Sequence, residues 1–332
     1  MNSTQIKNVE TMKTNNKFKF ISRLTEKHEV GIALALLLLI VFFSISSQSF
    51  FTFDNLINIA YQSSMVFIIA VGMTIIIILG GMDLSAGYVA GLAGMVTTGF
   101  LSAGRGLFLS ILAGLLVGAL IGAFNGILIT KIGITDFIVT LSTMSVAHGL
   151  IFAYSKGYPI YKNLSKEFQF IGQGHIFSIP VPIIIALFFF LFGHLFLTRF
   201  RIGTYVYATG GNKESSRLSG INVDRVKIVG YIVCGTLAAV AGIIMSSRLG
   251  SGQPTAGDGF LFAAIGASVL GGTSLMGGEG KIVGTLIGVF IMAVISNGLT
   301  LLNVPFYYQE VISGLIIILA VAYNSYRAKV NG

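Results

Sequence analysis

"GIALALLLLIVFFSISSQSFF", residues 31–51, carries no charged side chain over its whole length. About 20 residues at the helical rise of 1.5 Å cross the roughly 30 Å hydrocarbon core of a bilayer. The run is too long for the apolar core of a secretory signal and lacks a small-residue cleavage site. It therefore predicts a retained membrane-spanning helix, preceded by a polar and basic N-terminal segment.

The rest of the chain has the composition of a membrane protein. Hydrophobic residues make up 54% and charged residues only 10%, with 42 Gly and 5 Pro among 332 residues. An ordinary soluble domain has about a quarter charged residues. The formal net charge of +9 does not indicate nucleic-acid binding, because the basic residues fall at the ends of apolar runs rather than on one soluble face.

Apolar runs separated by polar, Gly or Pro residues predict an all-α, polytopic transmembrane bundle of about ten spans. With the N-terminus inside, 16 Lys and Arg residues fall on the cytoplasmic side and five on the other, counted over the printed sequence. This bias places both termini in the cytoplasm. The predicted spans are 31–50, 57–80, 84–103, 107–130, 134–154, 179–198, 228–248, 259–276, 281–302 and 306–326.

The same pattern divides the chain into three parts. Residues 1–30 are expected to form a cytoplasmic N-terminal tail, residues 31–326 the transmembrane domain, and residues 327–332 a cytoplasmic C-terminal tail. The lone Cys234 lies inside an apolar run, so an internal disulfide bond is excluded.

Rows of glycine predict close helix contacts. The fourth predicted span has Gly at 114, 118, 122 and 126, and the ninth has Gly at 280, 284 and 288. Small residues at a spacing of four allow helix backbones to approach closely in a membrane. We expect these rows to serve helix packing.

Two segments form a faint internal repeat. "LGGMDLSAG" (79–87) and "LGGTSLMGG" (270–278) share Leu-Gly-Gly and a final Gly at the same spacing, and each ends one apolar run and opens another. Paired Gly-interrupted segments in the two halves of a membrane protein often flank a transport route.

A polar island, residues 199–227, interrupts the apolar pattern with eight charged residues. Asn212 is a good helix N-cap, and Gly220 a good C-terminal stop because it tolerates the left-handed conformation. Between them lies a predicted helix of two turns at most, which needs a packing partner to be stable. The island is either a coupling loop that docks into a soluble subunit or a solvated loop whose Lys and Arg enforce topology.

Asp83 is an ionisable residue close to a span, which makes it a functional candidate. Its position also allows it to cap the third span by accepting from backbone N–H groups near Ala86. Ser85, in the same segment, and the intramembrane amides Asn125 and Asn297 are further candidates for a translocation pathway. Each amide suits either a sugar hydroxyl or a hydrogen bond between two helices.

No catalytic set and no cofactor motif is present. The Gly-rich "GGEGKIVG" (277–284) lacks the Lys-Ser/Thr ending of a phosphate-binding loop, so this chain is not expected to bind ATP itself. His148 and His194 have no Cys or carboxylate at ligand spacing, so no metal site is predicted.

The stretch "GTYVYATGGNKESSRLSGINVDRVKI" closely resembles the cytoplasmic loop of the ribose-type simple-sugar permeases, the membrane subunits of bacterial ATP-binding-cassette importers. Similar blocks follow the family order from about residue 50 to 310. They are "FFTFDNLINI", "GMTIIIILGGMDLSAG", "SGQPTAG" and "VLGGTSLMGGEGKIVGTLIG", followed by "NGL" and "YYQ". One departure is that ribose permeases commonly have acidic residues where this chain has Leu261 and Ala263, with Asp258 nearby but out of register.

The resemblance implies a non-catalytic subunit in the bacterial cytoplasmic membrane. Two permease chains, expected to be identical, would form the pathway through the lipid bilayer, two cytoplasmic ATPase subunits would drive it, and an extracytoplasmic binding protein would deliver the sugar. The residues carried over to the ATPase-coupling segment are Gly210, Gly211, Asn212, Glu214, Arg217, Leu218, Ser219, Gly220 and Ile221.

Two functional hypotheses follow. The first is a permease subunit of an ATP-driven, binding-protein-dependent importer for ribose or a related simple sugar. The second is an ion-coupled secondary transporter that uses Asp83 as its proton or sodium site. An enzyme acting on lipid-linked sugar is disfavoured, because clustered carboxylates and histidines are lacking.

Overall fold

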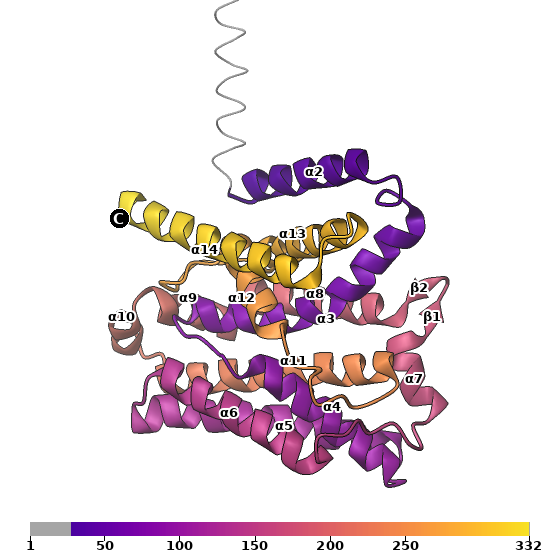
Figure 1. The fold of residues 1–332 in the computed structure, drawn as a ribbon. Helices are drawn as coiled ribbons and strands as arrows, with labels where there is room; N and C mark the ends of the chain where they lie inside the picture. Colours follow the sequence, from indigo (N-terminus) through magenta and orange to yellow (C-terminus); the bar gives the residue numbers. More distant parts are fainter. Residues whose placement is uncertain (1–27, 332) are drawn as a thin grey trace, which may run out of the picture.

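The computed structural model describes residues 28–331 as a bundle of helices with one two-stranded hairpin (Figure 1). The predicted N-terminal tail lies outside the described residues, apart from its last three. The elements are α2 (His28–Ser46), α3 (Phe53–Ile78), α4 (Ala86–Ser102), α5 (Leu107–Ile127), the π-helical turn η1 (Leu128–Ile132), α6 (Asp136–Ser155), α7 (Lys166–Gln173), β1 (His175–Ile176), β2 (Ile179–Pro180), α8 (Val181–Arg199), α9 (Arg201–Gly211), α10 (Lys213–Leu218), α11 (Val223–Leu249), α12 (Phe260–Leu270), α13 (Ile282–Leu301) and α14 (Phe306–Asn331).

The all-α membrane architecture is confirmed. Within the described residues, seven helices are long and apolar enough to cross a membrane, and three further apolar helices are shorter. Together these ten helices match the ten predicted spans in order. The short ones are α4, α12 and the part of α14 up to Ala322. The prediction for 259–276 is wrong in length, because α12 stops at Leu270 and the following Gly-rich segment is not helical.

The polar island is a pair of short helices rather than a loop. It contains α9, α10 and the first turn of α11.

Near the C-terminus, α14 continues to Asn331, so residues 327–331 of the predicted C-terminal tail are helical. The short helix α7 and strand β1 lie between the fifth and sixth predicted spans, in a stretch that mixes polar and apolar residues, and β2 coincides with the first two residues of the sixth predicted span.

The bundle has two distinct ends. The first residues of α2, the helix α10 and the last residues of α14 lie at one end, which we name the α10 end, while α7 and the hairpin lie at the opposite α7 end (Figure 1). An ion pair between Lys281 and Glu29 joins the starts of α13 and α2 at the α10 end. Both described termini thus lie on the same side of the bundle as the polar island.

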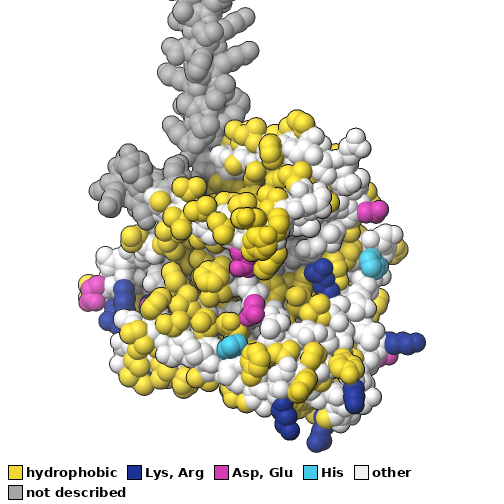
Figure 2. All heavy atoms as spheres, viewed as in Figure 1, with side chains coloured by type: hydrophobic (Ala, Val, Ile, Leu, Met, Phe, Trp, Pro, Cys, Tyr) yellow, Lys and Arg dark blue, Asp and Glu magenta, His cyan; other side chains and the backbone are white. Residues whose placement is uncertain are grey.

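Helices α3 and α11 form the centre. The apolar window of α3 is 83% buried and that of α11 61%, whereas that of α2 is only 6% buried. A helix that is apolar on all sides belongs in the interior of the bundle or in lipid. Figure 2 shows hydrophobic side chains spread widely across the visible face, as expected for a surface in contact with lipid tails.

The glycine row of α5 forms close helix contacts, as predicted, and Gly118, Gly122 and Gly126 pack against α11. A Cβ atom at Gly122 would lie 2.8 Å from the carbonyl carbon of Tyr231, and one at Gly126 would lie 2.8 Å from the Cα of Ile228. These distances are below any ordinary contact, so only glycine allows the two backbones to approach this closely. In α13, Gly284 and Gly288 pack in the same way against α12, while Gly280 precedes the helix.

Candidate functional site

Helix α10 has both predicted caps. The Asn212 Oδ1 atom accepts a hydrogen bond from the Ser215 backbone N–H at 2.8 Å. At the other end Gly220 has a φ of +82°, and the Ile221 N–H donates back to the Ser216 carbonyl at 3.0 Å. The local sequence thus caps both ends of a helix of six residues, Lys213–Leu218.

The side chains of α10 are exposed, apart from that of Ser216. Leu218 is 83% exposed, while Glu214 and Arg217 are exposed beside it and Ser216 faces the bundle. Ile221, which follows the helix, is half-buried against the main core. The helix therefore presents one large apolar side chain, flanked by charges, beyond the α10 end of the bundle.

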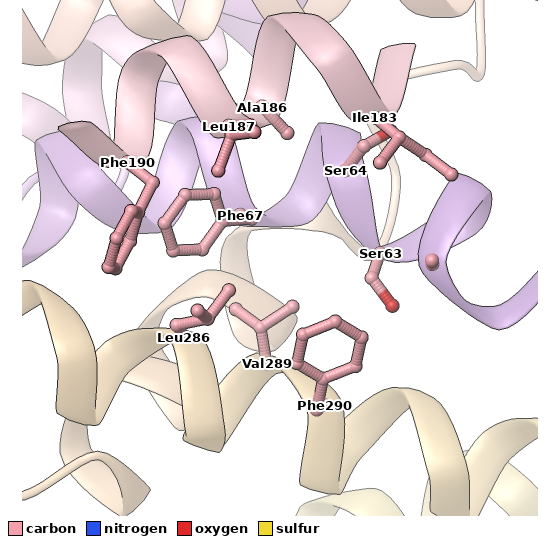
Figure 3. Close-up of a pocket in the computed structure, with 11 residues that line it drawn as sticks. Ser63, Ser64, Phe67, Ile183, Ala186, Leu187, Phe190, Leu286, Val289 and Phe290 are labelled. Carbon is pink, nitrogen blue, oxygen red and sulfur yellow. The ribbon is translucent and has the colours of Figure 1, made fainter. Parts of the chain in front are cut away.

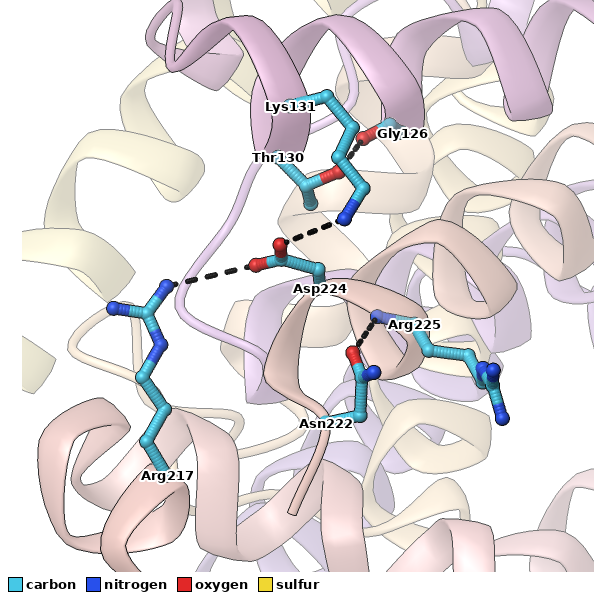
Figure 4. Close-up of polar contacts among 7 residues, drawn as sticks. All are labelled: Gly126, Thr130, Lys131, Arg217, Asn222, Asp224 and Arg225. Carbon is cyan, nitrogen blue, oxygen red and sulfur yellow. Dashed lines mark hydrogen bonds and ion pairs between the residues drawn. The ribbon is translucent and has the colours of Figure 1, made fainter. Parts of the chain in front are cut away.

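Ion pairs hold α10 to its neighbours (Figure 4). Asp224, at the start of α11, lies 3.5 Å from the Arg217 guanidinium and 3.1 Å from the Lys131 amine in η1. Asn222 caps α11 by accepting from the Arg225 N–H at 3.0 Å. Exposed pairs of this kind contribute roughly 0–1 kcal/mol each, so they orient α10 more than they stabilise the fold.

Behind α10, Gly210 and Gly211 rest on two other backbone segments. A Cβ atom at Gly210 would collide with the Ile78 carbonyl oxygen, and one at Gly278 would lie 2.8 Å from the Gly211 Cα. The Gly278 N–H itself donates to the Ile78 carbonyl at 2.8 Å. We name this three-way backbone contact of residues 78, 210–211 and 277–278 the glycine seat.

Tyr207 of α9 makes a hydrogen bond beside the glycine seat. Its hydroxyl donates to the Gly280 carbonyl at 2.7 Å. Burial raises the pKa of the Tyr207 phenol, so the hydroxyl remains a donor at neutral pH. Helices α9 and α10 are thereby joined to the end of α3 and to the segment that precedes α13.

Both Gly-Gly blocks of the internal repeat end a helix with the same hydrogen-bond pattern. After α3, Gly80 has a φ of +70° and the Gly81 N–H donates to the Ile76 carbonyl at 3.0 Å. After α12, Gly272 has a φ of +86° and the Thr273 N–H donates to the Ser268 carbonyl at 3.1 Å. The positive φ falls on the first Gly of the block at 79–87 and on the second Gly of the block at 270–278. In the structure Gly80 therefore corresponds to Gly272, one residue later than the match between the two sequence segments suggests.

The segment between α3 and α4 is held by side chains from two other helices. The Met82 N–H donates to the Asp136 carboxylate at 3.3 Å, and its carbonyl accepts from the Tyr231 hydroxyl at 3.2 Å and from Thr140 at 3.4 Å. Sequence reasoning missed Asp136 and Tyr231, because nothing in the local pattern links residue 82 to positions 54 and 149 residues away.

Three of the four predicted pathway residues meet in one buried network. The Asp83 carboxylate accepts from the Ser85 N–H at 2.9 Å and from the Ser85 hydroxyl at 2.6 Å. The Asn125 amide donates to the Ser85 hydroxyl at 3.1 Å and accepts from Thr143 at 2.7 Å. Asp83 therefore caps the start of α4, as one of its two predicted roles required, through the backbone N–H and the hydroxyl of Ser85, the residue before Ala86.

The fourth residue, Asn297, lies elsewhere and is already paired. Its amide exchanges two hydrogen bonds of 2.9 Å with the amide of Asn55 on α3. Asn55 also donates to the Phe50 carbonyl at 2.8 Å. This is the helix-bridging arrangement rather than a free amide that faces a ligand.

A cavity of about 180 Å³ opens between α3, α8 and α13 (Figure 3). Its walls are apolar side chains such as Phe67, Leu187 and Phe290. The hydroxyls of its two serines donate to carbonyls of their own helix, at 2.6 Å in both cases. The cavity offers no free polar group to a sugar, and hydrocarbon is the occupant that its surface suits.

These features define a class of protein, namely a polytopic membrane protein with broken helices joined by backbone contacts to an exposed helix at one end. The chain matches the family model described as branched-chain amino acid transport system / permease component over residues 55–321. It is 43% identical over 296 residues to the ribose import permease protein RbsC of Haemophilus influenzae, which covers 88% of this chain and 92% of that relative.

Two further relatives have the same description. The RbsC protein of Escherichia coli K12 is 44% identical over 291 residues, with 87% of this chain and 91% of the relative covered. The RbsC protein of Bacillus subtilis 168 is 44% identical over 294 residues, with 88% and 91% covered. The chain therefore belongs to this permease family, among the ribose-type permeases of ABC importers. No solved structure matches the chain.

The family membership confirms the resemblance seen in the sequence and the main functional hypothesis, a membrane permease subunit of an ABC importer. It does not support the ion-coupled alternative built on Asp83.

Proposed function

We propose that this chain carries ribose or a related simple sugar across the bacterial cytoplasmic membrane, and that residues 210–221 are the surface through which an ATPase subunit drives it. The observation that carries this proposal is the exposed, capped helix α10 with Leu218 at its tip, joined through the glycine seat to the end of α3. The proposed set comprises Gly210, Gly211, Asn212, Glu214, Arg217, Leu218, Ser219, Gly220 and Ile221.

The contacts suggest how force would travel. An ATPase that pulls on α10 would displace Gly210 and Gly211, which lie directly on Ile78 and Gly278. Packed backbones of this kind move as rigid bodies because no flexible side chain intervenes to absorb the shift. The two broken-helix segments would then shift together, and the bundle would change between outward and inward access. The ATPase supplies the bias between these two states.

The pathway residues keep a place in the proposal as supports. Asp83, Ser85 and Asn125 are buried in this conformation, with at most 1% of each exposed, so they would act by bracing the α3–α4 break beside the route. Asn297 would tie α13 to α3. In this role the Asp83 carboxylate is stabilised inside the bundle because it accepts two hydrogen bonds from Ser85.

Three partners are part of the proposal. The ATPase would dock at the α10 end, and the Lys and Arg bias supports a cytoplasmic location for this end. A sugar-loaded binding protein would dock at the opposite α7 end, and a second copy of this chain would complete the route within the lipid bilayer. In this arrangement residues 1–30 and 327–332 are cytoplasmic tails, residues 31–326 are the permease domain, and hydrolysis of ATP takes place on the partner.

Uptake into proteoliposomes distinguishes this function from ion coupling. With the ATPase and binding protein present, we expect ribose uptake to require ATP hydrolysis and to be unchanged by a protonophore or a sodium ionophore. Asp83→Asn should keep uptake within about threefold of wild type, because the oxygen of the introduced amide can still accept from Ser85. Uptake that collapses with the ionophore, or that Asp83→Asn abolishes while ATP hydrolysis continues, would contradict the proposal.

A further inference from the structure

The loop between α11 and α12, residues 250–259, runs from the α7 end into the interior of the bundle. Near its start Gly252 pairs with Ile160 through backbone bonds of 2.8 and 3.0 Å. Farther along, Gly257 packs against the first turn of α4: a Cβ atom at Gly87 would lie 2.9 Å from the Gly257 carbonyl oxygen. Gly87 is about four helical turns, roughly 22 Å, from the outer end of α4 at Ser102.

The length of α12, the helix that follows the loop, also indicates that the loop ends inside the membrane. Helix α12 has 11 residues and spans roughly 16 Å, about half of the hydrocarbon core, so it begins inside the membrane. Irregular backbone at such a depth is tolerated only where protein buries it or where it lines a water-filled cavity. Thr255, Asp258 and Gly259 are exposed on this chain, which leaves a water-filled route as the environment that fits them.

A set of polar and aromatic side chains gathers around this loop. Asp258 directly follows Gly257, and a Cβ atom at Gly257 would lie 3.2 Å from the Tyr88 Cα, so the loop brings Asp258 close to Tyr88. The Tyr88 ring lies edge-on to the His148 ring, with 4.7 Å between their centroids, and the His148 ring lies 5.0 Å from that of Phe152. Three separate segments, α4, α6 and the loop, thus contribute to one surface.

The chemistry of this surface suits a small polyhydroxylated ligand. The carboxylate accepts from hydroxyls, the imidazole and the phenol can donate or accept, and the aromatic rings offer faces to the C–H groups of a sugar ring. Lipid is a poor occupant, because a carboxylate facing hydrocarbon is costly. On the face shown in Figure 2, acidic and histidine side chains lie among the hydrophobic ones near its middle.

We propose that Tyr88, His148 and Asp258 form a sugar-contacting site on the translocation route, at the depth where α12 begins. The sugar as ligand rests on the proposed function, whereas the aqueous exposure of the site does not. The site brings the half-buried Tyr88 of α4 together with the exposed His148 of α6 and the exposed Asp258 of the loop, and it is separate from the buried Asp83 network.

Thiol labelling tests the aqueous exposure in the full chain. Its single cysteine, Cys234, is buried and would be replaced by Ala to give a cysteine-free background. Asp258→Cys in membranes should react with a charged methanethiosulfonate reagent at least about tenfold faster than Phe188→Cys, since only a hydrated thiol ionises. Phe188 is a matched control because it is 60% exposed on α8 within an apolar span. Equal, slow reaction of both variants would overturn the proposal.

Transport kinetics test the contact with sugar. In the assembled importer, Asp258→Asn and Tyr88→Phe should each lower ribose uptake about tenfold, while ATP hydrolysis stimulated by the loaded binding protein stays within twofold of wild type. Glu310→Gln, an exposed carboxylate on α14, is the control and should leave both rates unchanged. Unchanged uptake in both site variants, or a parallel fall in uptake and ATP hydrolysis, would reject the site. Absence of ATP-driven uptake by the wild-type chain would instead reject the proposed function and leave the labelling result standing.

Discussion

Replacing Leu218 by Asp is expected to abolish ATP-driven sugar uptake and co-purification of the chain with its ATPase. Leu218 is 83% exposed at the tip of α10 and touches little within the chain, so the change leaves the bundle intact. At a protein interface, an apolar side chain at the centre of a contact often supplies about 2 kcal/mol or more, and a buried, unpaired carboxylate in its place adds a further cost. Affinity for the ATPase should fall by about 100-fold or more.

Leu218 alone is a cleaner test than a change that includes Arg217. Arg217 pairs with Asp224, so an Asp at position 217 would set two carboxylates side by side and disturb α10 itself. Leu218→Lys is the companion variant, because a cation suits the C-terminal end of a helix while it still removes the apolar contact. Phe177→Asp, at a residue 97% exposed at the α7 end, is the matched control.

The readouts are pull-down of the ATPase from detergent extracts and ribose uptake into proteoliposomes. Both Leu218 variants should fail in both assays, and Phe177→Asp should retain the ATPase. If Leu218→Lys binds and transports as wild type does, the apolar contact proposed for α10 does not exist. If both Leu218 variants bind the ATPase normally, residues 210–221 are not the docking surface.

Gly122→Val is expected to prevent stable folding of the bundle. A side chain at this position would penetrate the backbone of α11 at Tyr231 and Ile232, where the nearest atoms are main-chain atoms that cannot rotate away. Overpacking a well-fitted contact costs typically about 1–3 kcal/mol, and a clash with backbone lies at the upper end of that range or beyond it. We expect a loss of about 3 kcal/mol or more and little folded protein in the membrane.

Gly149→Val is the matched control for this prediction. Gly149 also lies within a membrane helix, α6, but a Cβ atom there would have nothing within 4 Å. Thermal unfolding can be followed with a thiol-reactive dye, because the single, buried Cys234 becomes reactive when the helices separate. Gly149→Val should melt within about 3 °C of wild type. Equal melting temperatures for the two variants would show that the α5–α11 contact does not depend on glycine.

Sequence reasoning located the helices well because membrane spans have strong local signals. The predicted spans 281–302 and 228–248 differ from α13 and α11 by at most five residues at either end. The caps of α10 were equally readable, since Asn212 and Gly220 act on neighbours within five residues of themselves. The length of α12 was not readable, because hydropathy runs on through Leu270 into a segment where Gly271 and Gly272 end the helix.

The arrangement of the candidate pathway residues was only partly predictable, because it depends on contacts between distant parts of the chain. Asp83 and Asn125 stood out as polar groups in apolar runs, but their shared bonding through Ser85 depends on how α4 packs on α5. Asp258 looked like an isolated acid near a family block. Its place beside Tyr88 follows from the close approach of Gly257 to α4, which joins positions about 170 residues apart.

By itself the sequence determined that this chain is a polytopic helical membrane protein, that a short capped helix interrupts its spans, and that it resembles the ribose-type permeases. These features depend on hydropathy, helix capping and motif order, all of which act over short stretches of chain. Only the tertiary structure decided that Gly210 and Gly211 sit on the ends of broken helices, and that a loop between α11 and α12 enters the membrane beside Tyr88 and His148. Those arrangements depend on which backbones approach each other, and glycine permits a close approach without specifying its partner.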